Sequence, residues 1–342
     1  MLENQFPDYR EKHKNMNPQD IQKQLFDLIE LQIHPRKLSS ELGQILSIAP
    51  SAVYRRLSGE TLISFEQLLL LLKHYDVSFE QLTNPLAISF ELPTLLMPAR
   101  KLAEFLNLIE NDLTELSQFP KSIVRFAALE VPIFYYLASP PLAAFKFYMW
   151  QRTLMPLENY TLNKFSFKEF TNDSPLQMHI KNMVEMYNQV ESEEIWNSNM
   201  FDITLNQIRY CLNAGLFKNT NDVKILTDSI KQLIAHFETI VGSGKKSTDE
   251  TAAPIRVWYN ELFQNGMFIL SETPHKKLIY NSFDVPNFMV SANIEMYKVG
   301  FNFFNRMKSF SLDIMGVNEI NRHRFFERLY RKIEVFEKEL LV

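Results

Sequence analysis

Two adjacent arginines lie in the short segment Pro50-Ser51-Ala52-Val53-Tyr54-Arg55-Arg56-Leu57-Ser58-Gly59. Successive residues of a helix are rotated by about 100°, so Val53 and Leu57 share one face and Arg55 points away from it. An arginine that projects from a helix can form two hydrogen bonds with the O6 and N7 atoms of guanine in the major groove of DNA. The segment therefore predicts a helix that reads bases.

Several side chains of the same segment lie around Arg55. Ser51 points in nearly the same direction, whereas Tyr54 and Arg56 lie on the two flanks, where groove walls and phosphates would be. The residues that we expect to contact DNA are Ser51, Ala52, Tyr54, Arg55, Arg56 and Ser58. The alternative is a small packing or protein-interaction domain, although packing alone does not explain an outward arginine between two inward aliphatic residues.

Net charge does not draw the whole chain to nucleic acid. The chain carries a net charge of −4, and acidic residues outnumber basic ones between Asp20 and Asn84. Affinity for DNA must therefore depend on where a few basic side chains lie. The only adjacent arginines of that stretch are Arg55 and Arg56, on the helix expected to read DNA.

Four further short helices are expected around this one. Asn17-Pro18 is a typical helix start, and leucines and isoleucines recur at helical spacing both after it and between Leu38 and Ile45. The strings Ile63–Leu68 and Val77–Leu82 are nearly identical, and each has the serine and glutamine of a capping box. Five helices are thus predicted within residues 17–84.

The stretch from Glu41-Leu42-Gly43-Gln44 through Val53 to Gly59, followed by the two capped helices, resembles the lambda-repressor/Cro-like (Xre-type) helix-turn-helix family. The resemblance lies in a branch with a YRRLSGE-like string and covers only the N-terminal domain. It implies double-stranded DNA as the partner and places the base-contacting positions of the family on Pro50, Ser51 and Arg55. The sequence departs from the family pattern in having Ser47 at the usual turn glycine, Ala49 at the usual Ser or Thr cap, and Pro50 at a common polar reader.

The rest of the chain predicts a mainly α protein with a larger second domain. We expect a mobile polar tail at 1–16, the helix-turn-helix domain at 17–84, a linker at 85–98, and a C-terminal sensor or dimerisation domain at 99–342. Helices are expected from Leu102 to about Ile240. Beyond a flexible loop at 242–254, a possible sub-boundary, short strands are expected in a small antiparallel sheet. The expected strands are 256–262, 267–270, 277–280 and 288–290, followed by helices at 292–309 and 318–340.

Other residue patterns are weak as functional sites. Gly242–Ser247 lacks the spacing of a phosphate-binding loop, the seven histidines have no metal-ligand spacing, and Cys211 reads as a small buried hydrophobe. We therefore predict no catalytic residues, metal or cofactor. Aromatic residues between Phe134 and Trp150 either line a ligand pocket or, more often for such a pattern, form core.

Together these patterns predict a cytoplasmic, sequence-specific transcription regulator that is not an enzyme and has no membrane segment. We expect it to bind an inverted repeat as a homodimer, with a small molecule or peptide as effector. The final helix carries an apolar stripe that is the expected dimer surface, unless the stripe packs on its own core. That stripe is Phe325, Phe326, Leu329, Ile333 and Phe336. The rival hypothesis is a protein-interaction module without a specific DNA target.

Overall fold

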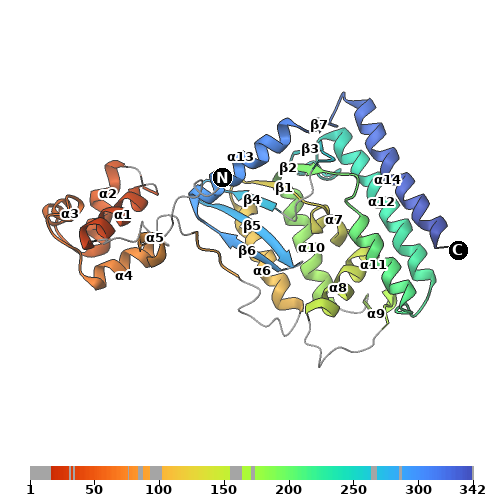
Figure 1. Ribbon diagram of the computed structural model, residues 1–342, viewed down its shortest axis with the longest axis horizontal. Coiled ribbons are helices and arrows are strands. Elements are labelled where there is room, and N and C mark those ends of the chain that lie inside the picture. The colour runs from red at the N-terminus through yellow and green to blue at the C-terminus, as the bar shows by residue number, and fades with distance from the viewer. Residues whose placement is uncertain are drawn as a thin grey trace, which may run out of the picture. The chain divides into compact units, whose positions relative to one another are not determined.

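The computed structural model describes residues 17–30, 32–33, 35–75, 77–83, 88–92, 102–154, 164–170, 174–262, 268–284 and 287–340. The chain divides into two units, Met1–Ser89 (unit 1) and Phe90–Val342 (unit 2) (Figure 1). The tail expected at 1–16 lies outside the described residues, as does most of the linker expected at 85–98. Among the described residues, no helix combines the length and the apolar composition needed to cross a membrane.

Unit 1 contains five helices around one small core. They are α1 (Pro18–Glu30), α2 (Pro35–Leu46), α3 (Pro50–Leu57), α4 (Phe65–His74) and α5 (Phe79–Thr83). Residues at helical spacing on α1 and α2 supply much of the core, which α3 joins through Val53 and α4 through Leu71. The capping box predicted at Ser64 is confirmed, because its side chain accepts a hydrogen bond from the Gln67 N–H. The side chain of Gln81, in the second predicted box, lies outside the described residues.

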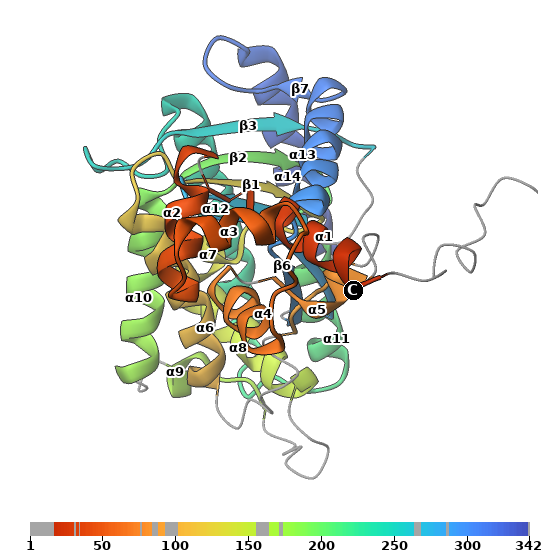
Figure 2. The ribbon, with the colours of Figure 1, turned by 90° about the vertical axis from the view of Figure 1, so that its left-hand side faces the viewer.

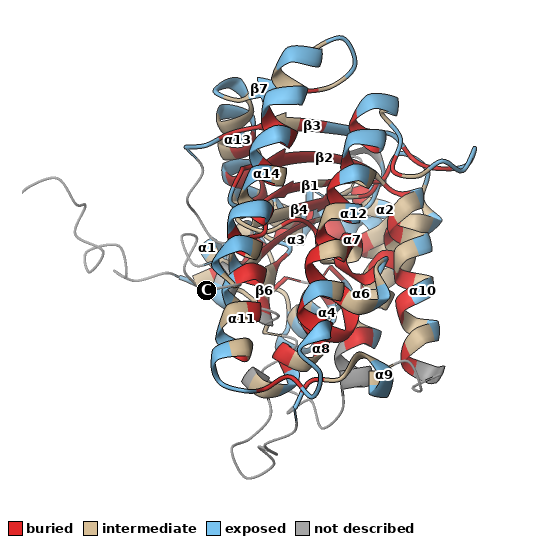
Figure 3. Cartoon of the chain, turned by 90° about the vertical axis from the view of Figure 1, so that its right-hand side faces the viewer, coloured by how far each residue is buried: buried red, intermediate tan, exposed pale blue. Residues whose placement is uncertain are grey.

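Unit 2 is built on a seven-stranded sheet with the order β6-β5-β4-β1-β2-β3-β7. The strands are β1 (Ile123–Ala127), β2 (Glu191–Trp196), β3 (Ile255–Tyr259), β4 (Phe268–Glu272), β5 (Lys277–Asp284), β6 (Asn287–Ser291) and β7 (Leu312–Asp313). The central strands β1, β2 and β3 are parallel, and the remaining pairs are antiparallel. Figure 3 shows that these central strands are largely buried.

The sheet corrects part of the expected fold. The chain is rich in helix and has a small sheet, but that sheet is mixed rather than an antiparallel meander, and β1 and β2 lie in a region expected to be helical. Parallel strands need long crossover connections, which helices provide here. The antiparallel strands β4, β5 and β6 do form a meander close to the predicted positions.

Helices cover both faces of this sheet (Figures 1 and 2). Its helices are α6 (Leu102–Gln118), α7 (Ile133–Leu137), α8 (Pro140–Leu154), α9 (Phe167–Phe170), α10 (Ser174–Gln189), α11 (Asp202–Asn213), α12 (Asn221–Ser243), α13 (Ile294–Ser309) and α14 (Glu319–Glu339). On one face, α13 packs against alternate strand residues such as Ala127 and Ile195. The main core of unit 2 lies on the other face, where Trp196 and Val257 meet residues from α7, α8, α10, α11, α12 and α14.

Of the two interpretations of the α14 stripe, packing on its own core is confirmed, and the expectation of a flexible loop at 242–254 is wrong. The apolar stripe of α14 is buried in the core of unit 2, with Phe325 and Phe326 each 1% exposed, so it is not the dimer surface. The segment 242–254 is not simply a flexible loop, because α12 continues to Ser243 and Lys246 is fully buried. The ammonium of Lys246 donates a hydrogen bond to the carbonyl of Tyr187, and unit 2 continues through the expected sub-boundary.

Candidate nucleic-acid interface and buried sites

The turn between α2 and α3 determines how α3 leaves the core. At the end of α2, the N–H of Ile48 donates to the carbonyl of Gly43, and the N–H of Ser47 donates to that of Gln44. These two bonds form a Schellman motif, whose second-last residue takes a left-handed conformation. Ser47 has φ 52°, so a serine occupies a backbone conformation that glycine favours. A Cβ on Gly43 would lie 3.3 Å from the Ile48 carbonyl oxygen, so the turn packs tightly on α2.

The left-handed conformation of Ser47 predicts that glycine at this position stabilises unit 1. Ser47→Gly is expected to raise the free energy of unfolding of unit 1 by roughly 0.5–1 kcal/mol, because the left-handed cost of serine exceeds the extra backbone entropy of glycine. The matched control is Ser40→Gly within α2, where the same change is expected to destabilise the unit by about as much. Calorimetry of both full-length variants measures the two shifts, and shifts of the same sign would contradict the assigned conformation.

The predicted reading helix has one buried and one exposed face. Val53 is 1% exposed and belongs to the core of unit 1, as predicted. Ser51, Tyr54, Arg55 and Ser58 are exposed, with Tyr54 at 62%. The guanidinium of Arg55 forms no hydrogen bond or ion pair with the residues that the structure describes. Helix α3 begins at Pro50, and its N-cap residue Ala49 makes no side-chain cap.

Arg56 has a role within unit 1 that the sequence did not indicate. It is half-buried, its Nε donates to Oε1 of Gln67 at 3.1 Å, and its Nη1 donates to the carbonyl of Ala52 at 3.1 Å. The same Gln67 oxygen accepts the N–H of Ser64 at the start of α4. Arg56 therefore ties the reading helix to the cap of the following helix, and Ala52, which is half-buried, provides the second contact.

A buried glutamine on α1 holds the same end of this helix. Gln22 is 3% exposed. Its Nε2 donates to the carbonyls of Arg56 at 2.7 Å and Thr61 at 2.9 Å, and its Oε1 accepts the N–H of Ile63 at 2.7 Å. Sequence reasoning missed this residue, although a polar side chain on the apolar face of α1 was a visible signal. Gln22 thus clamps the C-terminal end of α3 and the connection to α4.

Unit 2 contains a buried polar cluster around Glu194 of β2, which is fully buried. One carboxylate oxygen accepts hydrogen bonds from the hydroxyls of Tyr135, Tyr187 and Ser192, and the other accepts the indole N–H of Trp196. All four bonds are buried, where a hydrogen bond is electrostatically stronger than in water. The surrounding chemistry satisfies the carboxylate, so this cluster serves to hold α7 and α10 on the sheet.

The lysine beside this cluster is also satisfied internally. Lys246 lies over the ring of Tyr187, with Nζ 3.4 Å from the ring centroid. Burial lowers the pKa of Lys246 to about 7, against the opposing influence of Glu194 and Glu191. The string Gly242–Ser247 therefore holds its second lysine inside the protein, away from any phosphate in solution.

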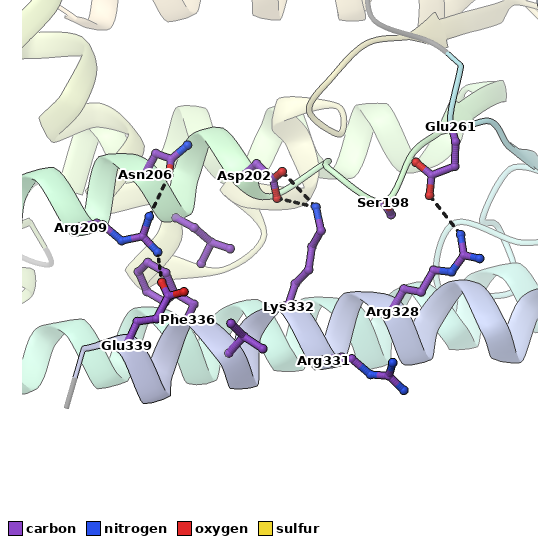
Figure 4. A pocket seen from close by; sticks show the side chains of 12 residues that line it. Ser198, Asp202, Asn206, Arg209, Glu261, Arg328, Arg331, Lys332, Phe336 and Glu339 are labelled. Atoms are coloured by element: carbon purple, nitrogen blue, oxygen red, sulfur yellow. Dashed lines mark hydrogen bonds and ion pairs between the residues drawn. The ribbon is translucent and has the colours of Figure 1, made fainter. Parts of the chain in front are cut away.

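A surface groove lies between α11 and α14, with a volume of about 540 Å³ (Figure 4). Its charged side chains face one another across the groove. Lys332 pairs with Asp202 at 2.9 Å, Arg328 with Glu261 at 3.2 Å, and Arg209 with Glu339. Because these cations already have carboxylate partners, we interpret the groove as a contact between α11 and α14 that exposed ion pairs bridge.

The remaining reactive groups are placed for structure. Cys211 is buried, and burial raises the pKa of its thiol to about 11, which keeps it in the poorly nucleophilic protonated form. Within the described ranges, no group of three or more His, Cys, Asp and Glu side chains is arranged to hold a metal ion. The aromatic residues between Phe134 and Trp150 fall into two groups. Phe145 and Phe147 are packed in the core, whereas Phe134, Tyr136 and Trp150 line a cavity.

Comparison of the chain with protein-family models, curated proteins and solved structures returned no match.

Proposed function

We propose that this protein is a cytoplasmic, sequence-specific transcription regulator in which α2, the turn at Ser47 and α3 act as a helix-turn-helix of the lambda-repressor type. The observation that carries the proposal is Arg55, a solvent-exposed arginine whose guanidinium has no partner among the described residues. It projects from a short helix that Val53 anchors in the core. A side chain so placed is free to make a bidentate contact with guanine.

The hydrogen bonds around α3 support this role. Gln22 and Arg56 fix the end of the helix to α1 and α4. A helix that enters the major groove must be held rigidly, because a shift of a side chain by about 1 Å loses the hydrogen-bond geometry on which base reading depends. Tyr54, Ser51 and Ser58 are exposed beside Arg55 and are proposed to contact the groove wall and phosphates.

One reading helix offers few contacts, so we further propose that the protein binds an inverted repeat as a homodimer. Paired recognition helices of this type occupy half-sites about one helical turn apart. The buried stripe of α14 does not provide the dimer contact. Unit 2 supplies the regulatory part of the molecule.

The direct test is Arg55→Ala. We expect the variant to fold like the wild type and to lose roughly 5- to 150-fold in discrimination between its selected site and a site with one guanine replaced, which corresponds to a contact of about 1–3 kcal/mol. Sites selected from random duplex DNA by the full-length wild type supply the probes. Competition binding at fixed salt concentration measures the ratio.

Two matched variants sharpen this test. Arg55→Lys keeps the positive charge but lacks the planar pair of donors, so it is expected to lose discrimination while keeping more affinity than Arg55→Ala. Lys73→Ala removes an exposed cation near the end of α4 and is expected to leave discrimination unchanged. If Arg55→Ala discriminates as well as the wild type, Arg55 does not read a base.

A protein-interaction module is the second candidate, and exposed apolar side chains on α4 favour it. Phe65 is 69% exposed and Leu69 is 50% exposed, and residues four apart lie on one helix face. If this face is the functional surface, a Phe65→Ser/Leu69→Ser variant would abolish partner binding, and the wild type would select no DNA sequence. Recovery of a defined DNA motif that depends on Arg55 rejects this candidate.

A further inference from the structure

An apolar cavity of about 220 Å³ lies in unit 2, between β1, β4 and the helices packed on that face of the sheet. Its wall includes Leu113 of α6, Phe126 of β1, Phe134 of α7 and Trp150 of α8. Apolar cavities smaller than this, of about 150 Å³, stay dry and accept benzene, whereas sites for drug-sized ligands begin at about 300 Å³. The space therefore suits a single ring with a short substituent.

The cavity reaches the surface at the start of α11. Ile203 belongs to its wall and is 39% exposed, whereas Ala128 and Tyr136 on the same wall are 4% and 1% exposed. A ligand thus has an approach from solvent and an interior lined mainly by apolar side chains.

Polar side chains interrupt the apolar wall, among them Asp112, which accepts the hydroxyl of Tyr280 at 3.1 Å, and an ion pair. Lys146 donates to Oε1 of Glu130 at 2.6 Å, and the side chains are 4% and 17% exposed. The same Oε1 accepts the hydroxyl of Thr204 at 2.9 Å and that of Tyr136 at 3.3 Å. The second oxygen, Oε2, accepts no hydrogen bond from the residues that the structure describes. Glu130 lines the cavity and its side chain is 17% exposed, so Oε2 is accessible rather than sealed inside the protein, and a ligand that carries a hydrogen-bond donor can bond to it.

We propose that this cavity binds a small uncharged aromatic molecule with one hydrogen-bond donor, of the phenol or indole class. The ring packs among Phe134, Trp150 and the aliphatic wall, and its O–H or N–H donates to Oε2 of Glu130. Lys146 and Glu130 neutralise each other, and Asp112 already accepts the hydroxyl of Tyr280, so a charged ligand would bring an uncompensated charge into a largely apolar space. Binding at this site does not depend on whether unit 1 binds DNA.

The test uses 4-methylphenol and toluene with the full-length protein; both have a methyl-substituted ring, and only 4-methylphenol carries a hydrogen-bond donor. Calorimetric titration is expected to show saturable binding of 4-methylphenol to one site per chain, and toluene is expected to bind about tenfold more weakly, since it leaves Oε2 unpaired. Ala128→Leu adds volume to the cavity wall and is expected to weaken 4-methylphenol binding at least tenfold. The matched control Ala235→Leu places the same change on an exposed position of α12 and is expected to bind like the wild type.

A size series on the wild type keeps the test decisive even if Ala128→Leu fails to fold by circular dichroism. The ring of 2,6-di-tert-butylphenol is too bulky for the cavity and is expected not to bind. The proposal is overturned if 4-methylphenol gives no saturable binding, if the bulky phenol binds as well as 4-methylphenol, or if folded Ala128→Leu retains wild-type affinity.

Discussion

Gln22→Leu is expected to unfold unit 1 at temperatures where unit 2 stays folded, and to abolish DNA binding with it. The substitution keeps the apolar stem but leaves the carbonyls of Arg56 and Thr61 and the N–H of Ile63 without their partner. A buried group that loses its partner costs about 1–3 kcal/mol. Because these groups are part-buried and water can reach some of them, we expect a total loss of about 2–4 kcal/mol. A five-helix unit of this size has little more to lose.

Differential scanning calorimetry of the full chain measures this effect as a shift of one transition, because the two units have separate cores. Gln19→Leu is the matched control, since Gln19 lies on the same helix and is exposed, and it is expected to leave both transitions unchanged. A Gln22→Leu protein that melts and binds DNA like the wild type would show that the clamp is dispensable.

Much of unit 1 could be predicted from the sequence, because the patterns that specify it lie within single helices. Helical spacing of apolar residues located α1 and α2, and the burial of Val53 followed from its phase relative to Leu57. The capping box at Ser64 is read from residues only three apart. The outward position of Arg55 needed no more than the geometry of one helix.

The contacts that hold the reading helix could not be predicted in the same way. Gln22 reaches residues 34 to 41 positions away in the chain, and no periodicity specifies that distance. Arg56 was expected on the phosphate side, yet its Nε and Nη1 are used within unit 1. A side chain on the flank of a helix can turn to either side, and only the position of α4 decides between them.

Strand β2 shows why the sheet of unit 2 was missed. Its sequence, Glu-Ser-Glu-Glu-Ile-Trp, has no run of apolar residues, yet five of its six residues are buried. Glu193 pairs with Arg125 at 2.9 Å and Lys308 at 2.6 Å, on one face of the sheet, while Glu194 accepts hydroxyl and indole donors on the other. Arg125, Lys308 and Tyr135 lie 59 to 115 residues away from the glutamates that they contact, so a strand buried by such partners has the composition of an exposed segment.

The proposed dimer predicts a second large effect, which is expected when the DNA sequence rather than the protein is changed. Sequences selected by the full-length wild type are expected to form an inverted repeat with half-site centres about 10 base pairs apart, or a multiple of that spacing. Scrambling one half-site is expected to lower the affinity by on the order of 10²–10⁴. Once one reading helix is bound, the other is held close to its own half-site and binds nearly intramolecularly, and scrambling that half-site removes this second contact. Scrambling an equal length of flanking sequence is the control and is expected to change little.

Mobility-shift titrations at one salt concentration measure this loss, and the mass of the complex reports two chains on the intact site. Arg55→Ala provides a second check, since each chain of a dimer carries one copy of the substitution and its penalty applies at both half-sites. When the guanine is replaced in both half-sites, the loss in discrimination is therefore expected to approach the square of the loss measured with one guanine replaced. A selected motif with one half-site, bound by one chain with no loss when flanking sequence is scrambled, would contradict dimeric binding while leaving Arg55 as a base reader.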